Sequence, residues 1–209
     1  QQGYGICVGH TVPGIDLRII AIIDDSIPEW VDSIELTHGE IGEIVVKGPW
    51  VSRSYFNRNE ATRLTKIKDH GNALWHRMGD VGYIDDKTRL WFCGRKSQCV
   101  RTADGTLFTI QCEGVFNAHP KVKRSALVGV GETENQKPVI IIEPEHFREL
   151  KNNSARNSLI KELLALGGQY NHTHQIKDIL IYQNFPVDIR HNAKISREQL
   201  AQWATQKIP

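Results

Sequence analysis

The feature that most constrains the fold is a change in the sequence pattern near residue 95. Residues 1–95 contain short runs of β-branched residues that are broken by glycine and acidic turns. The strands expected there are Ile15–Ile23, Gly42–Lys47, Val81–Ile84 and Leu90–Cys93. One helix is expected over Glu60–Ile67, with Asn59 as its N-cap. The first part of the chain is therefore predicted to be rich in β-sheet.

From about Gln98 the pattern changes to a hairpin followed by alternating helices and strands. The hairpin is predicted at Asp104-Gly105, a dipeptide that favours a type I′ turn, between strands over Cys99–Ala103 and Thr106–Thr109. The elements expected after it are a helix over Cys112–Ala118, strands over Ser125–Val130 and Val139–Glu143, a helix that Asn153 caps and Gly167-Gly168 end, and a strand over Ile179–Tyr182. We place a boundary at Gly94–Ser97 and predict the α+β fold class.

Lys194 lies in a segment near the end of the chain that has no clear helix or strand pattern. Ser196 and Gln199 have the spacing of a capping box, which predicts a helix from about Arg197 and leaves Lys194 on the loop before it. A lysine there is a compact positive charge that suits neutralisation of an anion. Taken alone, an exposed lysine is more often only a solvated charge.

Composition excludes several classes of function. The 209 residues carry a formal net charge of only +2, which does not argue for nucleic acid or an anionic membrane as a partner. No apolar run is long enough for a transmembrane helix, and no signal peptide is recognisable. The four cysteines and nine histidines lack the spacing of a metal site. We expect a cytoplasmic protein with reduced thiols and no metal site of its own.

The only methionine is Met78, and the chain begins Gln-Gln-Gly. We therefore expect the sequence to be the C-terminal portion of something longer.

Three groups of residues form an ordered series: Trp75-His-Arg-Met-Gly-Asp80-Val-Gly-Tyr-Ile-Asp85, then Leu90-Trp-Phe-Cys-Gly-Arg95, then Lys194. This series resembles the adenylate-forming superfamily, which includes acyl-CoA synthetases, nonribosomal-peptide adenylation domains and luciferases. Gly42–Gly48 and Tyr55-Phe56-Asn57 match what precedes these motifs in the family. The resemblance implies that residues 1–95 are the β-rich, barrel-like end of a large N-terminal domain. It also implies that residues 96–209 are a small, mobile α+β lid domain.

The resemblance assigns chemical roles to three residues. Asp80 matches the carboxylate that accepts hydrogen bonds from the ribose hydroxyls, and the alternative is a carboxylate that only caps its turn. Arg95 matches the arginine that contacts the nucleotide near the interdomain joint, and the alternative is a surface ion pair. Lys194 matches the lysine that bridges the substrate carboxylate and the α-phosphate during adenylation.

The family's hinge and acceptor hairpin also have counterparts, with departures from the pattern. Ser97 occupies the hinge position, where aspartate or lysine is usual. Asp104, Gly105 and Thr106 match the hairpin that admits the thiol arm of an acceptor, and the alternative is a simple surface hairpin. Asn192-Ala193-Lys194 replaces the usual Ser/Thr-Gly-Lys.

These departures point to one branch of the family. The stretches Trp75–Asp80, Arg101–Ile110 with Cys112-Glu113, and Arg190–Ile195 resemble the enzymes of bacterial olefin biosynthesis that act as β-lactone synthetases. The resemblance implies a fatty-acid-type carboxylate substrate, possible partners among pathway enzymes, ATP and AMP, and Mg²⁺ bound with ATP by ligands mostly outside this chain. An ordinary fatty-acyl-CoA synthetase, which would use CoA, and a non-catalytic interaction module derived from such an enzyme remain as alternatives. The family's phosphate loop, adenine wall and acyl pocket are expected upstream, so we predict that residues 1–209 alone are inactive.

Overall fold

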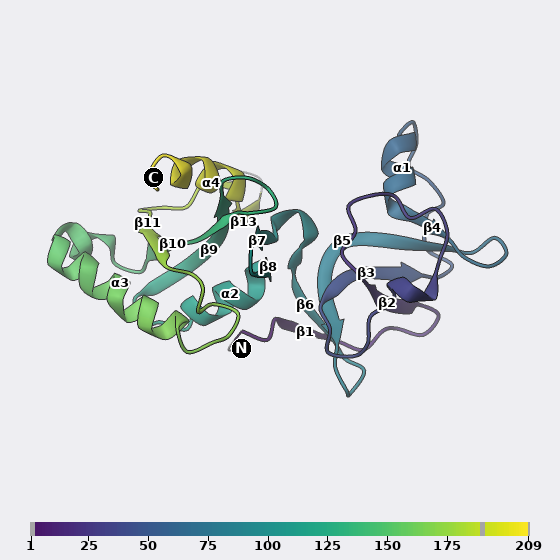
Figure 1. Cartoon of the computed structure of the whole chain (residues 1–209), viewed down its shortest axis with the longest axis horizontal. Coiled ribbons are helices and arrows are strands. Elements are labelled where there is room, and N and C mark those ends of the chain that lie inside the picture. Colours follow the sequence, from purple (N-terminus) through teal and green to yellow (C-terminus); the bar gives the residue numbers. More distant parts are fainter. Residues whose placement is uncertain (1–2, 189–190, 209) are drawn as a thin grey trace. The chain divides into compact units, whose positions relative to one another are not determined.

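The computed structural model describes residues 3–188 and 191–208. The chain divides into two compact units (Figure 1), Gly5–Ser97 and Gln98–Pro209, and the second unit also takes in Gln1–Tyr4. Both units contain strands and helices, so the α+β class is confirmed.

The first unit is built on a six-stranded sheet in the order β1-β6-β5-β3-β2, with β4 pairing β5. Its strands are β1 (Ile6–Gly9), β2 (Asp16–Ile20), β3 (Gly42–Lys47), β4 (Lys66–Lys68), β5 (Leu74–Ile84) and β6 (Leu90–Arg95). All neighbouring strands are antiparallel. Within the described residues β1 and β2 end the order without pairing each other, so the sheet is open and the barrel-like form expected for this part is not confirmed.

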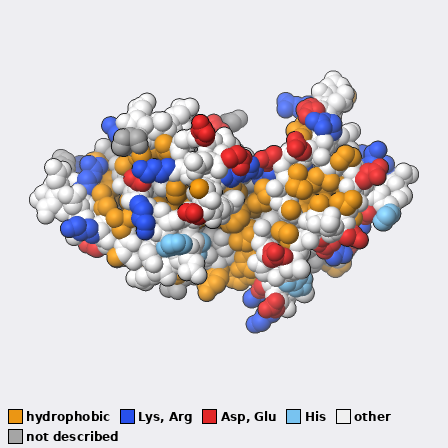
Figure 2. All heavy atoms as spheres, in the orientation of Figure 1, with side chains coloured by type: hydrophobic (Ala, Val, Ile, Leu, Met, Phe, Trp, Pro, Cys, Tyr) orange, Lys and Arg blue, Asp and Glu red, His pale blue; other side chains and the backbone are white. Residues whose placement is uncertain are grey.

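The core of the first unit lies beneath this sheet. It consists of Ile20, Ile27, Val45, Ile67 and Trp75, and the ring of Trp30 stacks on Trp75 with centroids 4.8 Å apart. Two short helices, η1 (Asp32–Ile34) and α1 (Asn59–Thr65), complete the unit. Figure 2 shows hydrophobic side chains gathered on the visible face of this unit. The large hydrophobic side chains of the unit that remain exposed are Ile6, Val8, Val12, Val31, Trp50, Tyr55, Phe56 and Met78.

The second unit surrounds a three-stranded sheet in the order β11-β10-β9. Its strands are β9 (Val122–Val130), β10 (Lys137–Pro144) and β11 (Asp178–Ile181). Residues Val139 to Ile142 of β10 are all fully buried because the sheet is covered on both faces. One face packs with α2 (Thr109–Phe116) and α3 (Asn153–Gly167), and the other with α4 (Arg197–Thr205).

Two small hairpins are attached to the second unit. The first pairs β7 (Val100–Thr102) with β8 (Gly105–Leu107), and the second pairs β12 (Val187–Asp188) with β13 (His191–Ile195). Short helices η2 (Lys96–Gln98) and η3 (Phe147–Lys151) connect the larger elements.

Several local predictions are wrong for identifiable reasons. The helix expected to reach Ile67 ends at Thr65, because the next residues pair with β5 as strand β4, and its N-cap is Arg58 rather than Asn59. The N-cap of α3 is Asn152 rather than the expected Asn153, because the Asn152 side chain accepts a hydrogen bond from the Ser154 N–H at 2.8 Å.

The type I′ turn expected at Asp104-Gly105 is also wrong. Thr102 pairs with Gly105, so the turn residues are Ala103 and Asp104. A type I′ turn needs positive φ at both central residues, and here only Gly105 takes positive φ, at 124°.

Candidate functional site

Strand β5 bulges at Met78, Gly79 and Asp80. Its neighbour β3 pairs Val45 with Arg77 and Glu43 with Val81, so these three residues of β5 lie opposite one residue of β3. Gly79 takes φ 68°, a left-handed conformation that glycine adopts without steric cost. Bulges bend a strand and redirect its side chains, and they are frequent beside active sites.

Asp80 and Arg95 lie side by side in the sheet. They occupy paired positions on β5 and β6, and Nη1 of Arg95 lies 2.8 Å from Oδ1 of Asp80. The Asp80 side chain is 18% exposed and that of Arg95 is 58% exposed. The Asp80 Oδ1 atom is buried, and the Arg95 guanidinium is the cation that faces it. The site thus offers a partly desolvated carboxylate with acceptor capacity beside an exposed guanidinium.

Burial raises the pKa of Asp80, while the charge of Arg95 and its contact with the carboxylate act to lower it. Burial is the stronger influence, so the folded protein disfavours the charged form relative to a free aspartate. A ligand that donates hydrogen bonds to this carboxylate would relieve that cost, because such bonds stabilise the charged form. The described residues therefore fit a ligand that presents hydroxyl groups or other hydrogen-bond donors to Asp80.

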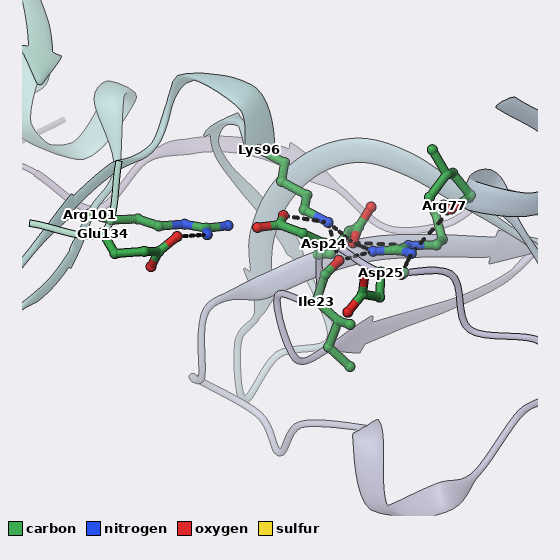
Figure 3. A network of polar contacts seen from close by, with 9 residues as sticks. Ile23, Asp24, Asp25, Arg77, Lys96, Arg101 and Glu134 are labelled. Carbon is green, nitrogen blue, oxygen red and sulfur yellow. Dashed lines mark hydrogen bonds and ion pairs between the residues drawn. The ribbon is translucent and has the colours of Figure 1, made fainter. Parts of the chain in front are cut away.

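The first unit also contains a buried network centred on Glu43, and Figure 3 shows its members Arg77, Lys96 and Ile23 close together. Arg77 donates to Oε2 of Glu43 from Nε at 3.1 Å and from Nη2 at 2.6 Å. Its other hydrogen bonds go to the backbone oxygens of Ile23, Asp25 and Leu64. Lys96 also reaches Oε2 of Glu43, at 3.2 Å, and donates to the oxygen of Ile23. The sequence interpretation missed this network, although an acidic residue inside the apolar run of β3 was a signal for a buried partner.

Ser97, the expected hinge, is exposed and is the last residue of the first unit. The residue before it is held firmly, because Nζ of Lys96 contacts Glu43 and lies 3.4 Å from Oδ1 of Asp24. The division between the units thus follows immediately after an anchored side chain.

Lys194 is exposed on strand β13 of the second unit, so the loop expected around it is wrong. Pairing with β12 makes the strand: Val187 pairs with Ile195, and the N–H of Ser196 donates to the oxygen of Pro186 at 2.8 Å. Helix α4 begins at Arg197 with Ser196 as N-cap, as predicted, but the Ser196 side chain makes no capping hydrogen bond.

The hairpin with Asp104, Gly105 and Thr106 is stabilised by Thr102. The Thr102 Oγ1 donates to the oxygen of Gly105 at 2.8 Å, and accepts from the N–H of Asp104 at 3.2 Å. Asp104 and Gly105 are exposed at its tip.

Among the described residues, no three His, Cys, Asp or Glu side chains approach closely enough to hold a metal ion. In the same part of the chain, no helix is long and apolar enough to cross a membrane.

Comparison with known proteins places the chain in a class. No protein-family model matches it. Its fold matches ATP-bound MatB from Rhodopseudomonas palustris with a TM-score of 0.71 at 23% identity, over 96% of this chain and 36% of that chain. The chain belongs to the adenylate-forming superfamily of synthetases and ligases, as the motifs of the sequence implied.

Within that superfamily the chain is similar to two proteins called olefin beta-lactone synthetase. It is 49% identical over 211 residues to the protein from Xanthomonas campestris pv. campestris, covering 99% of this chain and 37% of that protein. It is 45% identical over 212 residues to the protein from Stenotrophomonas maltophilia, covering 100% of this chain and 38% of that protein. The chain thus spans less than two fifths of the length of these relatives.

Proposed function

We propose that the chain is the C-terminal part of an ATP-dependent enzyme that activates a fatty-acid-type carboxylate and closes it to a β-lactone. The observation that carries this proposal is the 49% identity to an olefin beta-lactone synthetase over 99% of the chain. The exposed hydrophobic side chains of the first unit support a place within a larger protein, because apolar patches of this kind commonly mark a covered surface.

The proposed reaction has two steps. A carboxylate oxygen of a 2-alkyl-3-hydroxy fatty acid attacks the α-phosphorus of ATP, and the bond to pyrophosphate breaks. The 3-hydroxyl oxygen then attacks the acyl carbon and loses its proton, and the bond between that carbon and the AMP oxygen breaks. An intramolecular nucleophile has a high effective concentration, so this closure needs no external thiol.

We assign the first step to residues in both units. Asp80 would accept hydrogen bonds from the ribose hydroxyls of the nucleotide, and Arg95 would contact the nucleotide beside it. Lys194 would neutralise the charge that builds up between the substrate carboxylate and the α-phosphate. The partly buried carboxylate of Asp80, whose charged form burial disfavours, supports the first of these roles.

The remaining assignments concern the change between the two steps. We propose Ser97 as the hinge between a large N-terminal domain, to which residues 1–95 belong, and a lid formed by residues 96–209. The anchored Lys96 and the division of the chain after Ser97 support this position. The hairpin of Asp104, Gly105 and Thr106 would face the active site in the second step, where it matches the family hairpin that admits the thiol arm of an acceptor. Mg²⁺ would enter with ATP, held by ligands mostly outside this chain.

The test of the reaction uses the whole protein that carries this chain, incubated with ATP and a 2-alkyl-3-hydroxy fatty acid. We expect AMP, pyrophosphate and a β-lactone without CoA. A thioester that forms only when CoA is added would identify an ordinary fatty-acyl-CoA synthetase instead. Absence of ATP–pyrophosphate exchange would identify a non-catalytic module. Robust exchange by residues 1–209 alone would contradict the expected need for the rest of the protein.

The test of Lys194 is Lys194→Ala in the whole protein. Loss of a preorganised cation at the developing charge should raise the activation free energy of adenylation by about 3 kcal/mol, which slows the step roughly one hundredfold. ATP–pyrophosphate exchange measures this step, and Lys161→Ala, which removes an exposed lysine from α3 of the same unit, is the control. Unchanged exchange in Lys194→Ala would overturn the assignment.

A further inference from the structure

The hairpin that carries Lys194 is fastened at its entrance to a buried carboxylate. Glu143 on β10 is 1% exposed, and its Oε2 accepts a hydrogen bond from the Phe185 N–H at 2.8 Å. The cations Arg124 and Lys123 lie 2.8 and 3.0 Å from the same carboxylate. Phe185 is itself buried in the core beside α4. The backbone just before the hairpin is therefore held in place at Phe185.

The exit of the hairpin is fastened to a second buried carboxylate. Arg197 is the first residue of α4, and its Nη2 lies 2.7 Å from both Oε1 and Oε2 of Glu113. Glu113 lies on α2 with its side chain 7% exposed, and its Oε1 also accepts the Leu127 N–H of β9 at 2.9 Å. One carboxylate thus joins α2, β9 and the start of α4.

These anchors matter because the hairpin has little support of its own. Strand β13 pairs only with β12 among the described residues, in a two-stranded sheet. An isolated two-stranded hairpin is marginally stable in water, so its geometry depends on what holds its ends. Arg197 follows Lys194 by three positions, and its side chain is largely buried at 16% exposure. Along the chain, the Glu113–Arg197 pair is the nearer of the two anchors to Lys194.

We propose that Glu113 is a positioning residue for Lys194, acting through Arg197. The carboxylate holds the start of α4, and thereby fixes the end of β13 from which the Lys194 side chain projects. This inference rests on the adenylation role proposed for Lys194 and adds a residue that touches neither the substrate nor the nucleotide.

The experiment uses the whole enzyme with two variants, Glu113→Gln and the double variant Glu113→Gln/Arg197→Met. The glutamine oxygen can still accept the Leu127 N–H, so the single variant chiefly removes the charge that faces Arg197. The double variant leaves no uncompensated charge at the buried site, and replacing both partners of such a pair can be nearly neutral for stability. Glu162→Gln is the control, because that carboxylate pairs with Lys121 at 2.9 Å on the surface of the same unit.

We expect both variants to slow adenylation about tenfold, because a small misplacement of a catalytic group is costly. The KM for ATP should stay unchanged, since Asp80 and Arg95 lie in the other unit. In the Lys194→Ala background, Glu113→Gln should cause no further loss, because the group that it positions is gone. Hydrogen exchange at the Lys194 and Ile195 amides should be faster in Glu113→Gln, with exchange at Ile140 unchanged.

Three results would overturn the inference while leaving the role of Lys194 intact. The double variant could melt normally and keep the wild-type adenylation rate. The loss from Glu113→Gln could persist in full in the Lys194→Ala background, which would indicate a general structural effect. Exchange at Lys194 and Ile195 could stay unchanged. Full adenylation in Lys194→Ala itself is a different result and would overturn the proposed role of that lysine, and the inference with it.

Discussion

The residues proposed for nucleotide binding and the proposed catalytic lysine are held by different kinds of structure. Asp80 and Arg95 face each other on neighbouring strands of a six-stranded sheet, so the register of β5 and β6 sets their separation. Lys194 projects from a two-stranded hairpin whose ends are tied to buried carboxylates. The separation of Asp80 and Arg95 therefore depends on the sheet and on the buried residues that support it. The position of Lys194 depends instead on anchors that are distant from the lysine.

The largest effect that tests this difference should come from Arg77→Met. The variant removes one cation from the buried Glu43 and leaves Lys96 as its nearby cation. Removing one partner of a buried ion pair lowers the free energy of unfolding by about 3–5 kcal/mol. Unfolding of the first unit should be followed by tryptophan fluorescence, since Trp30, Trp50, Trp75 and Trp91 all lie in it.

Arg18→Met is the matched control for this prediction. Arg18 pairs with Glu35 at 2.7 Å, but the two side chains are 52% and 31% exposed. Replacing Arg18 by methionine should therefore lower the free energy of unfolding by no more than about 1 kcal/mol. Equal losses of unfolding free energy in the two variants would show that the Glu43 network does not support the sheet as described.

The next effect concerns function rather than stability, and comes from Asp80→Asn. Hydrogen bonds to a charged group contribute about 1.5–3 kcal/mol, so loss of the carboxylate should raise the KM for ATP by roughly ten- to one-hundredfold. The free energy of unfolding should change by less than about 1 kcal/mol, because the ion pair with Arg95 is partly exposed. Asp86→Asn, an exposed acid on the adjacent turn, is the control. An unchanged KM would contradict the ribose assignment.

The sequence predicts the elements of this site better than their arrangement. The motif that contains Asp80 and the one that contains Arg95 are recognisable in order along the chain, and the strand Gly42–Lys47 has the predicted bounds. The pairing of Asp80 with Arg95 depends on the bulge at Met78–Asp80, which exists only when β5 lies between β3 and β6.

Two other features could not be predicted because they depend on tertiary contacts. The strand β13 has a composition, His-Asn-Ala-Lys-Ile, with little β-propensity, and pairing with β12 makes it a strand. Glu43 meets Arg77 and Lys96 across separations of 34 and 53 residues, which no local pattern encodes. Local turn chemistry likewise misplaced the turn at Asp104-Gly105, because the register of β7 and β8 decides it.

A smaller effect should distinguish the bulge from an ordinary turn. Gly79 and Gly71 have φ of 68° and 70°, and an added Cβ would meet nothing within 4 Å at either position. Replacement by alanine at each should therefore cost about 1 kcal/mol of backbone strain and little else. Only Gly79→Ala should also raise the KM for ATP, because Asp80 is the next residue. The same KM in both variants would show that the bulge does not set the position of Asp80.

The smallest expected effect is a loss of stability of the first unit at acidic pH. The side chain of Arg89 holds the pKa of Asp85 well below its usual range, with further hydrogen bonds from the Trp91 side chain and the backbone N–H groups of Arg89 and Lys87. A carboxyl whose pKa is lowered by folding adds stability above its unfolded pKa of about 4, and that stability is lost as the pH falls toward the folded pKa. Asp85→Asn should flatten the acid side of the unfolding curve reported by the tryptophans. The contribution is small because solvent screens this partly exposed pair. Adenylation, which depends on Lys194 in the other unit, should not change. An acid response that is identical in the variant would show that the Asp85 contacts add nothing to the stability of the sheet.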